Sequence, residues 1–158
     1  MNIENRTFDE IQPGEAASLV RTLTHKDIAL FAIMSGDVNP THLDEAFAKS
    51  DMFHQVVAHG MWAAALFSTV LGTELPGPGT VYTDQSLHFQ RGIRLGDTIT
   101  LTVKVKNKIL ATQRVVFECC ALNQNGEEVI TGMAEVIAPT EKISRPRGAL
   151  KSPQKIIG

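Results

Sequence analysis

An aspartate and a histidine, Asp37 and His42, stand five residues apart in the segment Gly-Asp-Val-Asn-Pro-Thr-His. Carboxylates and imidazoles are common general acids and bases in enzymes. Pro40 cannot continue a preceding helix, and it holds Asn39 extended, so a tight turn must separate the two side chains. The turn can bring them together around one water molecule, with Asn39 fixing the loop through its side-chain amide.

A second candidate is Gly60, which opens a long apolar stretch in the string His-Gly-Met. Backbone N–H groups at a helix N-terminus are ready donors to a developing negative charge, and glycine lets a ligand approach closely. The alternative is an ordinary helix entry at which glycine only avoids a clash. Ser68, about two turns further along the same helix face, either orients Asp37 or the water, or bonds back to the preceding turn.

The elements that must position these residues are helices. One helix is predicted from Thr24, a good N-terminal cap, to Ser35, because the following Gly36 suits a left-handed C-terminal cap. A short second helix is expected over residues 44–49. Residues 60–71 are apolar at nearly every position, which predicts a buried helix that is too short to cross a bilayer.

Strands fill most of the remaining sequence. Residues 15–23 form a short β-prone run, and residues 80–138 alternate apolar and polar side chains, with a turn at 123–126. This order predicts an α+β fold in which an antiparallel sheet wraps around one central buried helix. The two cysteines, Cys119 and Cys120, are neighbours in a strand and point to opposite faces, so no disulfide or cysteine metal site is expected.

Length and composition favour one domain, over residues 1–139, because 158 residues with 43% hydrophobic content can bury a sizeable core. The net charge of −2 makes nucleic acid or an anionic membrane an unsuitable partner. The polar N-terminus does not resemble a signal peptide, so a cytoplasmic location is expected. Residues 140–158, basic and broken by prolines, are interpreted as a tail or linker, or as a basic contact for a phosphorylated ligand.

Five segments carry a resemblance to a known family. They are residues 31–44, 59–61, 75–82, 85–89 and 96–97. Together they extend across most of residues 5–138 and resemble the MaoC-like, (R)-specific enoyl-CoA hydratases, which have the hot-dog fold. The opening residues, the His-Gly-Met-Trp string and the basic tail are most similar to the N-terminal hydratase-like domain of bifunctional enoyl-CoA hydratase/phosphate acetyltransferase proteins.

The resemblance implies a lyase of fatty-acid metabolism that acts on acyl-CoA without a metal or other cofactor. Asp37 and His42 would hold the catalytic water, and the Gly60 amide would polarise the thioester carbonyl. Serine also stands at the matching point in the family, which favours a supporting role for Ser68. Trp62 would either limit the length of the acyl chain or belong to the core. A homodimer that joins two sheets edge to edge is implied as well.

Three alternatives stay open on the sequence. Two are enzymes on the same fold, an acyl-carrier-protein dehydratase and a thioesterase. The third is a module that binds acyl-CoA or a partner without catalysis, and the intact Asp37, Asn39 and His42 argue against it. The sequence does not indicate the acyl chain length or the division of proton transfers between Asp37 and His42.

Overall fold

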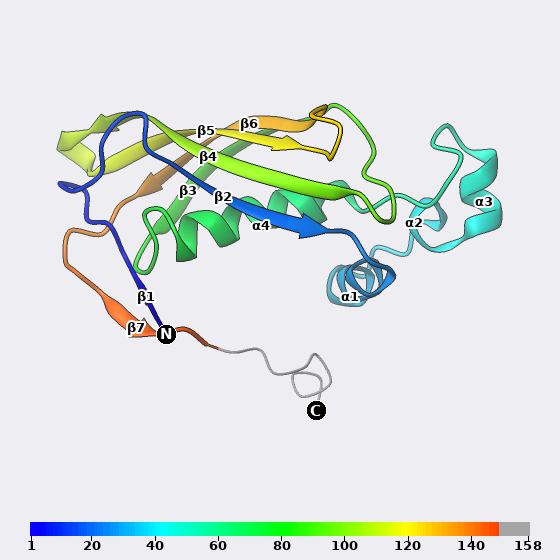
Figure 1. Ribbon diagram of the computed structural model, residues 1–158, viewed down its shortest axis with the longest axis horizontal. Coiled ribbons are helices and arrows are strands. Elements are labelled where there is room, and N and C mark those ends of the chain that lie inside the picture. The colour runs from blue at the N-terminus through cyan, green and yellow to red at the C-terminus, as the bar shows by residue number, and fades with distance from the viewer. Residues whose placement is uncertain (149–158) are drawn as a thin grey trace.

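A curved antiparallel sheet lies over one long helix, and three shorter helices cluster beyond one end of it (Figure 1). The structure is a computed structural model that describes residues 1–148. The helices are α1 (His25–Ser35), α2 (Pro40–Leu43), α3 (Glu45–Ser50) and α4 (Gly60–Thr73), with a 3₁₀ turn at Leu110–Thr112. The strands are β1 (Asn2–Glu4), β2 (Ala16–Thr22), β3 (Val81–Phe89), β4 (Thr98–Ile109), β5 (Arg114–Leu122), β6 (Glu128–Ile137) and β7 (Ser144–Pro146).

The main sheet has the order β2-β4-β5-β6-β3, and every neighbouring pair is antiparallel. Strands β4, β5 and β6 follow one another as the predicted meander. The sheet is completed at its two edges by β2 and β3, which come before and after α4 in the chain. The predicted α+β arrangement is therefore confirmed, with α4 contacting β2, β3 and β4.

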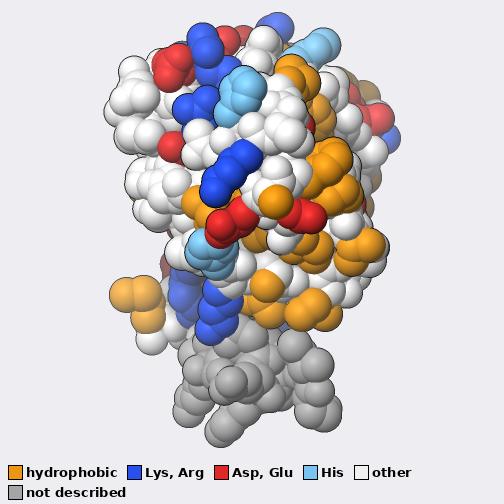
Figure 2. Space-filling view, turned by 90° about the vertical axis from the view of Figure 1, so that its right-hand side faces the viewer, with side chains coloured by type: hydrophobic (Ala, Val, Ile, Leu, Met, Phe, Trp, Pro, Cys, Tyr) orange, Lys and Arg blue, Asp and Glu red, His pale blue; other side chains and the backbone are white. Residues whose placement is uncertain are grey.

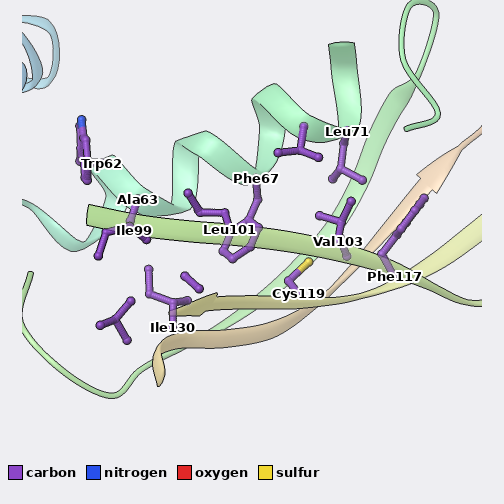
Figure 3. Close-up of a cluster of buried hydrophobic side chains, with 14 of the residues drawn as sticks. Trp62, Ala63, Phe67, Leu71, Ile99, Leu101, Val103, Phe117, Cys119 and Ile130 are labelled. Carbon is purple, nitrogen blue, oxygen red and sulfur yellow. The ribbon is translucent and has the colours of Figure 1, made fainter. Parts of the chain in front are cut away.

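The core lies between α4 and the concave face of the sheet (Figure 3). Alternate residues of β4 and β5 point toward α4 because side chains in a strand have a two-residue period. These inward residues are at most 3% exposed. They are Ile99, Leu101, Val103, Val105, Val115, Phe117, Cys119 and Ala121.

Helix α4 is not buried all round, which corrects the prediction from its apolar sequence. Its core face is buried, but Met61 is 55% exposed and Ser68 is also exposed. This second face is open to solvent in the single chain. Within residues 1–148, no helix has the length and hydropathy required to traverse a membrane.

The expected tail begins too early at residue 140. Strand β7 pairs with β1, and the buried side chain of Asn5 bonds to the backbone of Glu141 and Ile143 at 2.8 and 3.0 Å. Residues 140–148 are thus packed against the N-terminal segment. The pairing joins positions far apart in the sequence, so the local composition gave no sign of it. The remainder of the predicted tail, 149–158, lies outside the described residues.

Candidate active site

Helix α1 precedes Asp37 in the chain, and its two ends are fixed by caps. Thr24 and Asp27 form a capping box at its start, in which the Thr24 side chain accepts from the Asp27 N–H and the Asp27 carboxylate accepts from the Thr24 N–H. At its end Gly36 has a φ of 75°, a left-handed conformation, and its N–H donates to the Ala32 carbonyl at 2.8 Å. Both predicted caps are confirmed, and α1 ends at Ser35, two residues before Asp37.

The loop after Gly36 is short because a new helix starts at Pro40. The Asp37 carboxylate accepts from the Asn39 N–H at 3.1 Å, and the Asn39 side-chain carbonyl accepts from the Thr41 N–H at 3.2 Å. Asn39 is thus the N-terminal cap of α2, with Pro40 in the first turn. The sequence predicted a turn here and missed the helix, which carries His42.

The His42 ring is oriented by a backbone contact. Its Nδ1 lies 2.8 Å from the carbonyl oxygen of Val57, in the segment that leads into α4. A carbonyl only accepts, so Nδ1 carries the proton of the neutral ring and Nε2 keeps its lone pair. A half-buried imidazole held in one tautomer is suited to exchanging a proton through Nε2.

Asp37 and His42 do converge, and a third side chain joins them. One ligand-type atom from each of Asp37, His42 and His59 lies within 4.8 Å of the other two. His59 is 2% exposed, its Nε2 lies 3.0 Å from the Asp37 backbone oxygen, and its ring stacks on that of His42 with centroids 4.0 Å apart. No separate role was predicted for His59, although its place directly before Gly60 was a signal.

Gly60 is the first residue of α4 and lies beside the pair. It lines a pocket of about 320 Å³ together with His42 and with apolar side chains that include Phe53 and Phe89. A Cβ at position 60 would lie 2.9 Å from Cε1 of Phe89, closer than carbon atoms pack. A side chain at this point therefore requires the exposed Phe89 ring to move. The first N–H groups of α4 have no partner within the helix.

Asp37 is not among the lining residues of this pocket. His42 and Gly60 face the pocket, while the Asp37 carboxylate approaches His42 from beside it. The arrangement places an exposed carboxylate, an oriented imidazole and a helix N-terminus around one region. Such a set of groups can exchange two protons with a bound molecule and stabilise negative charge on its oxygen.

The two supporting candidates lie elsewhere. Trp62 is 7% exposed in the core cluster and does not line the pocket of His42, so the structure favours the core interpretation (Figure 3). Ser68 was expected to be buried, but it is exposed and lines a second pocket of about 490 Å³ between α1, α4 and β3, with Met61 and Tyr82. Within residues 1–148, the Ser68 hydroxyl makes no hydrogen bond to Asp37.

The three clustered side chains have the composition of a metal site, but their geometry does not fit one well. Imidazole binds a metal ion in the plane of its ring. The rings of His42 and His59 stack with centroids 4.0 Å apart and an interplanar angle of 29°, so one ion close to both rings cannot lie in the plane of each. His42 Nδ1 and His59 Nε2 also face carbonyl oxygens already. The cluster is better suited to proton exchange than to metal binding.

A curved antiparallel sheet around one central helix, with polar groups at the helix N-terminus, defines a hot-dog-fold protein. Residues 10–123 match the family model described as MaoC like domain, and the chain belongs to this family. An (R)-specific enoyl-CoA hydratase from Rhodospirillum rubrum is 44% identical over 133 residues, which span 84% of this chain and 91% of that protein.

Solved structures are similar over nearly the whole chain. The R-hydratase PhaJ1 from Pseudomonas aeruginosa has a TM-score of 0.91 and 38% identity, covering 96% of this chain and 97% of its own. The (R)-hydratase from A. caviae has a TM-score of 0.79 and 36% identity, covering 82% of this chain and 98% of its own. The family and the fold expected from the sequence are therefore both confirmed.

Proposed function

We propose that this protein is a hydro-lyase that reversibly hydrates a trans-2-enoyl-CoA to the (R)-3-hydroxyacyl-CoA. The observation that carries the proposal is the convergence of Asp37 and His42 next to the N-terminus of α4. The similarity to proteins named (R)-specific enoyl-CoA hydratase supports it. The reaction needs no redox cofactor, because water adds across the double bond without transfer of electrons to another molecule.

Asp37 and His42 carry the proton transfers in this proposal. The water oxygen forms a bond to C3 of the enoyl thioester while one of its protons passes to the pair. A proton then reaches C2, which has received the electrons of the double bond. The lone pair on His42 Nε2 and the Asp37 carboxylate are the two acceptors available, and the Val57 carbonyl holds the imidazole in place throughout.

Gly60 supplies the electrostatic part of the reaction. Attack at C3 moves negative charge through C2 to the thioester oxygen, so the transition state resembles an enolate. The N–H of Gly60, at the positive end of the α4 dipole, is the donor proposed for that oxygen. A donor that is fixed before the reaction stabilises this charge more than it stabilises the neutral substrate.

A homodimer completes the proposal. β3 is an edge strand of the main sheet, pairs only with β6 within the described residues, and exposes Val81, Tyr82 and Phe89. Long unpaired edges invite pairing with another chain. Large hydrophobic side chains are also exposed around α1 to α3. Figure 2 faces this end of the molecule and shows the hydrophobic side chains mostly on one side of the view. We expect the dimer to act on acyl-CoA in the cytoplasm.

The test is incubation of the purified protein with crotonyl-CoA, following the enoyl-thioester absorbance and free thiol together. Loss of absorbance without thiol is expected. Thiol release would instead identify a thioesterase, and saturable binding without either change would identify a non-catalytic module. A parallel assay with the crotonyl thioester of acyl-carrier protein shows which of the two carriers the protein accepts. The variant His25→Gln, changed at an exposed residue, is the control and should retain the wild-type activity.

A further inference from the structure

His59 occupies a position from which it touches every part of the proposed machinery. It is the residue before Gly60 and the N-terminal cap position of α4, yet its side chain makes no capping bond to the helix. The side chain is 2% exposed and turns toward the loop and helix that carry Asp37 and His42. Buried polar groups are normally hydrogen-bonded, so the contacts of this ring show what it holds.

Its first contact is a hydrogen bond to the main chain of Asp37. The Nε2 of His59 lies 3.0 Å from the Asp37 carbonyl oxygen, which can only accept. The His59 ring therefore carries its proton on Nε2. This bond joins the end of α1 to the start of α4 across 22 residues of sequence, and it fixes the backbone from which the Asp37 carboxylate projects.

Its second contact is with the His42 ring. The two imidazoles stack with centroids 4.0 Å apart and an interplanar angle of 29°, and the Phe31 ring lies 4.8 Å from the His59 centroid. His42 is held at one edge by the Val57 carbonyl and over one face by His59. Edge and face contacts together leave the ring little freedom to rotate away from the pocket.

The second nitrogen of the His59 ring has different surroundings from Nε2. His59 Nδ1 is buried and has no hydrogen-bond partner within the described residues. A second proton on Nδ1 would place an unpaired donor and a positive charge inside the protein, directly against His42. The neutral ring with its proton on Nε2 satisfies the contact with Asp37 and adds no such donor.

We propose that His59 is a positioning residue for the hydration reaction, one that holds the Asp37 backbone and the His42 imidazole in register with the Gly60 amide. The inference rests on the proposed function. His59 does not need to touch the substrate, because it acts through the two residues that exchange protons. His59 positions these residues through two contacts, the hydrogen bond donated by its Nε2–H and the stacking of its ring on His42. Mutations can remove the two contacts separately.

Three variants separate these contacts. His59→Ala removes both, His59→Gln keeps an N–H donor without the aromatic ring, and His59→Phe keeps a ring without the donor. We expect His59→Ala to lower kcat about 10-fold or more, by analogy with the roughly 10- to 100-fold loss when the partner that orients a metal-binding histidine is removed. KM should stay within about twofold, because the substrate contacts remain. Each conservative variant should recover part of kcat, and His25→Gln should match the wild type.

Folding is checked by the thermal transition of each variant. An unchanged kcat in folded His59→Ala would overturn the proposal. If His59→Ala does not fold, His59→Gln and His59→Phe decide: a kcat equal to that of the wild type in both overturns it, and a lowered kcat at constant KM in either supports it. A rise in KM with unchanged kcat would also overturn it, since that result indicates a substrate contact.

A spectroscopic test does not depend on turnover. Two-bond proton–nitrogen correlation spectra of the imidazoles should show His59 protonated at Nε2 and His42 at Nδ1 in the neutral rings. The His42 signals should move in His59→Ala and less in His59→Phe. Unmoved His42 signals overturn the positioning role whether or not the wild type hydrates crotonyl-CoA. Moved signals in a protein without hydratase activity retain the role and reject the proposed reaction.

Discussion

The two ends of α4 differ in what they contact. At the N-terminal end, His59 contacts the Asp37 carbonyl in the loop after α1 through one atom pair, and the His42 side chain of α2 through one ring. Toward the C-terminal end, Phe67, Val70 and Leu71 are at most 1% exposed and pack among apolar side chains of the sheet (Figure 3). In the proposed function, the N-terminal end of α4 thus supports the reaction and the rest of the helix supports the fold.

This difference implies that mutations should be able to change the reaction rate and the stability of the protein separately. Apolar packing has no preferred direction and is shared among many neighbours, so its loss is felt as a change in the free energy of unfolding. The polar end depends on orientation, so a small displacement there changes rate far more than stability.

Trp62 lies two residues from Gly60 yet belongs to the core, so it tests where along α4 the contribution to stability begins. Trp62→Ala should lower the free energy of unfolding by about 3–5 kcal/mol, the usual loss for a buried tryptophan. Since Trp62 does not line the pocket of His42, the ratio of kcat/KM for C4 and C8 enoyl-CoA should stay unchanged in the folded variant. Denaturant titration and a chain-length series measure the two effects, and a shift toward C8 would show that Trp62 is a pocket wall.

Asp37→Asn and His42→Ala test the chemical end. Each should lower kcat about 10²-fold, equivalent to about 2.7 kcal/mol, the scale of a positioned acid or base. Neither should alter the thermal transition much, because Asp37 is exposed and His42 is only half-buried. Steady-state kinetics with active-site titration provide the measurement. Near-normal turnover of either variant would remove that residue from the mechanism.

The β1–β7 pairing is a second structural region remote from the site, at the opposite end of the molecule from α2 (Figure 1). Ending the chain at Pro139 removes both side-chain partners of the buried Asn5. The two hydrogen bonds of the Asn5 side chain are worth about 1 kcal/mol each, so the free energy of unfolding should fall by at least about 2 kcal/mol relative to a chain ending at Gly148. The β1–β7 pairing and the bond from the Asn5 N–H to the Ile143 carbonyl are lost as well. Activity per folded molecule should be equal in the two chains, and equal stability would contradict the structural role.

The sequence predicted the elements that depend on local patterns. The caps of α1 at Thr24 and Gly36, the long apolar helix and the alternating strands are set by residues close together in the chain, and the structure confirms them. The pairing of Asp37 with His42 was also foreseeable, because Pro40 forces the turn between them. The resemblance to a family added the role of Gly60, which composition and spacing alone left open.

The sequence did not predict features that depend on distant contacts. The β1–β7 pair joins the two ends of the described chain, and the His59 bond crosses 22 residues. Ser68 was placed by helical periodicity and Trp62 by its closeness in sequence to Gly60, but neither signal shows which helix face meets the sheet. The structure puts Trp62 on the core face and Ser68 on the exposed face.

Asn39 gives the smallest expected effect and lies closest to the border between stability and chemistry. Its side-chain carbonyl caps α2, which has only one turn and carries His42, so Asn39→Ala should lower the free energy of unfolding by about 1 kcal/mol. Because the released turn holds His42, kcat should fall as well, by less than in His42→Ala. Asn39→Ser, which retains a capping oxygen, is the matched control and should recover both losses. A different result is possible, in which Asn39→Ser restores the stability lost in Asn39→Ala but does not restore kcat. That result would show that the Asn39 amide itself contacts the reacting groups and has a role in the reaction besides capping α2.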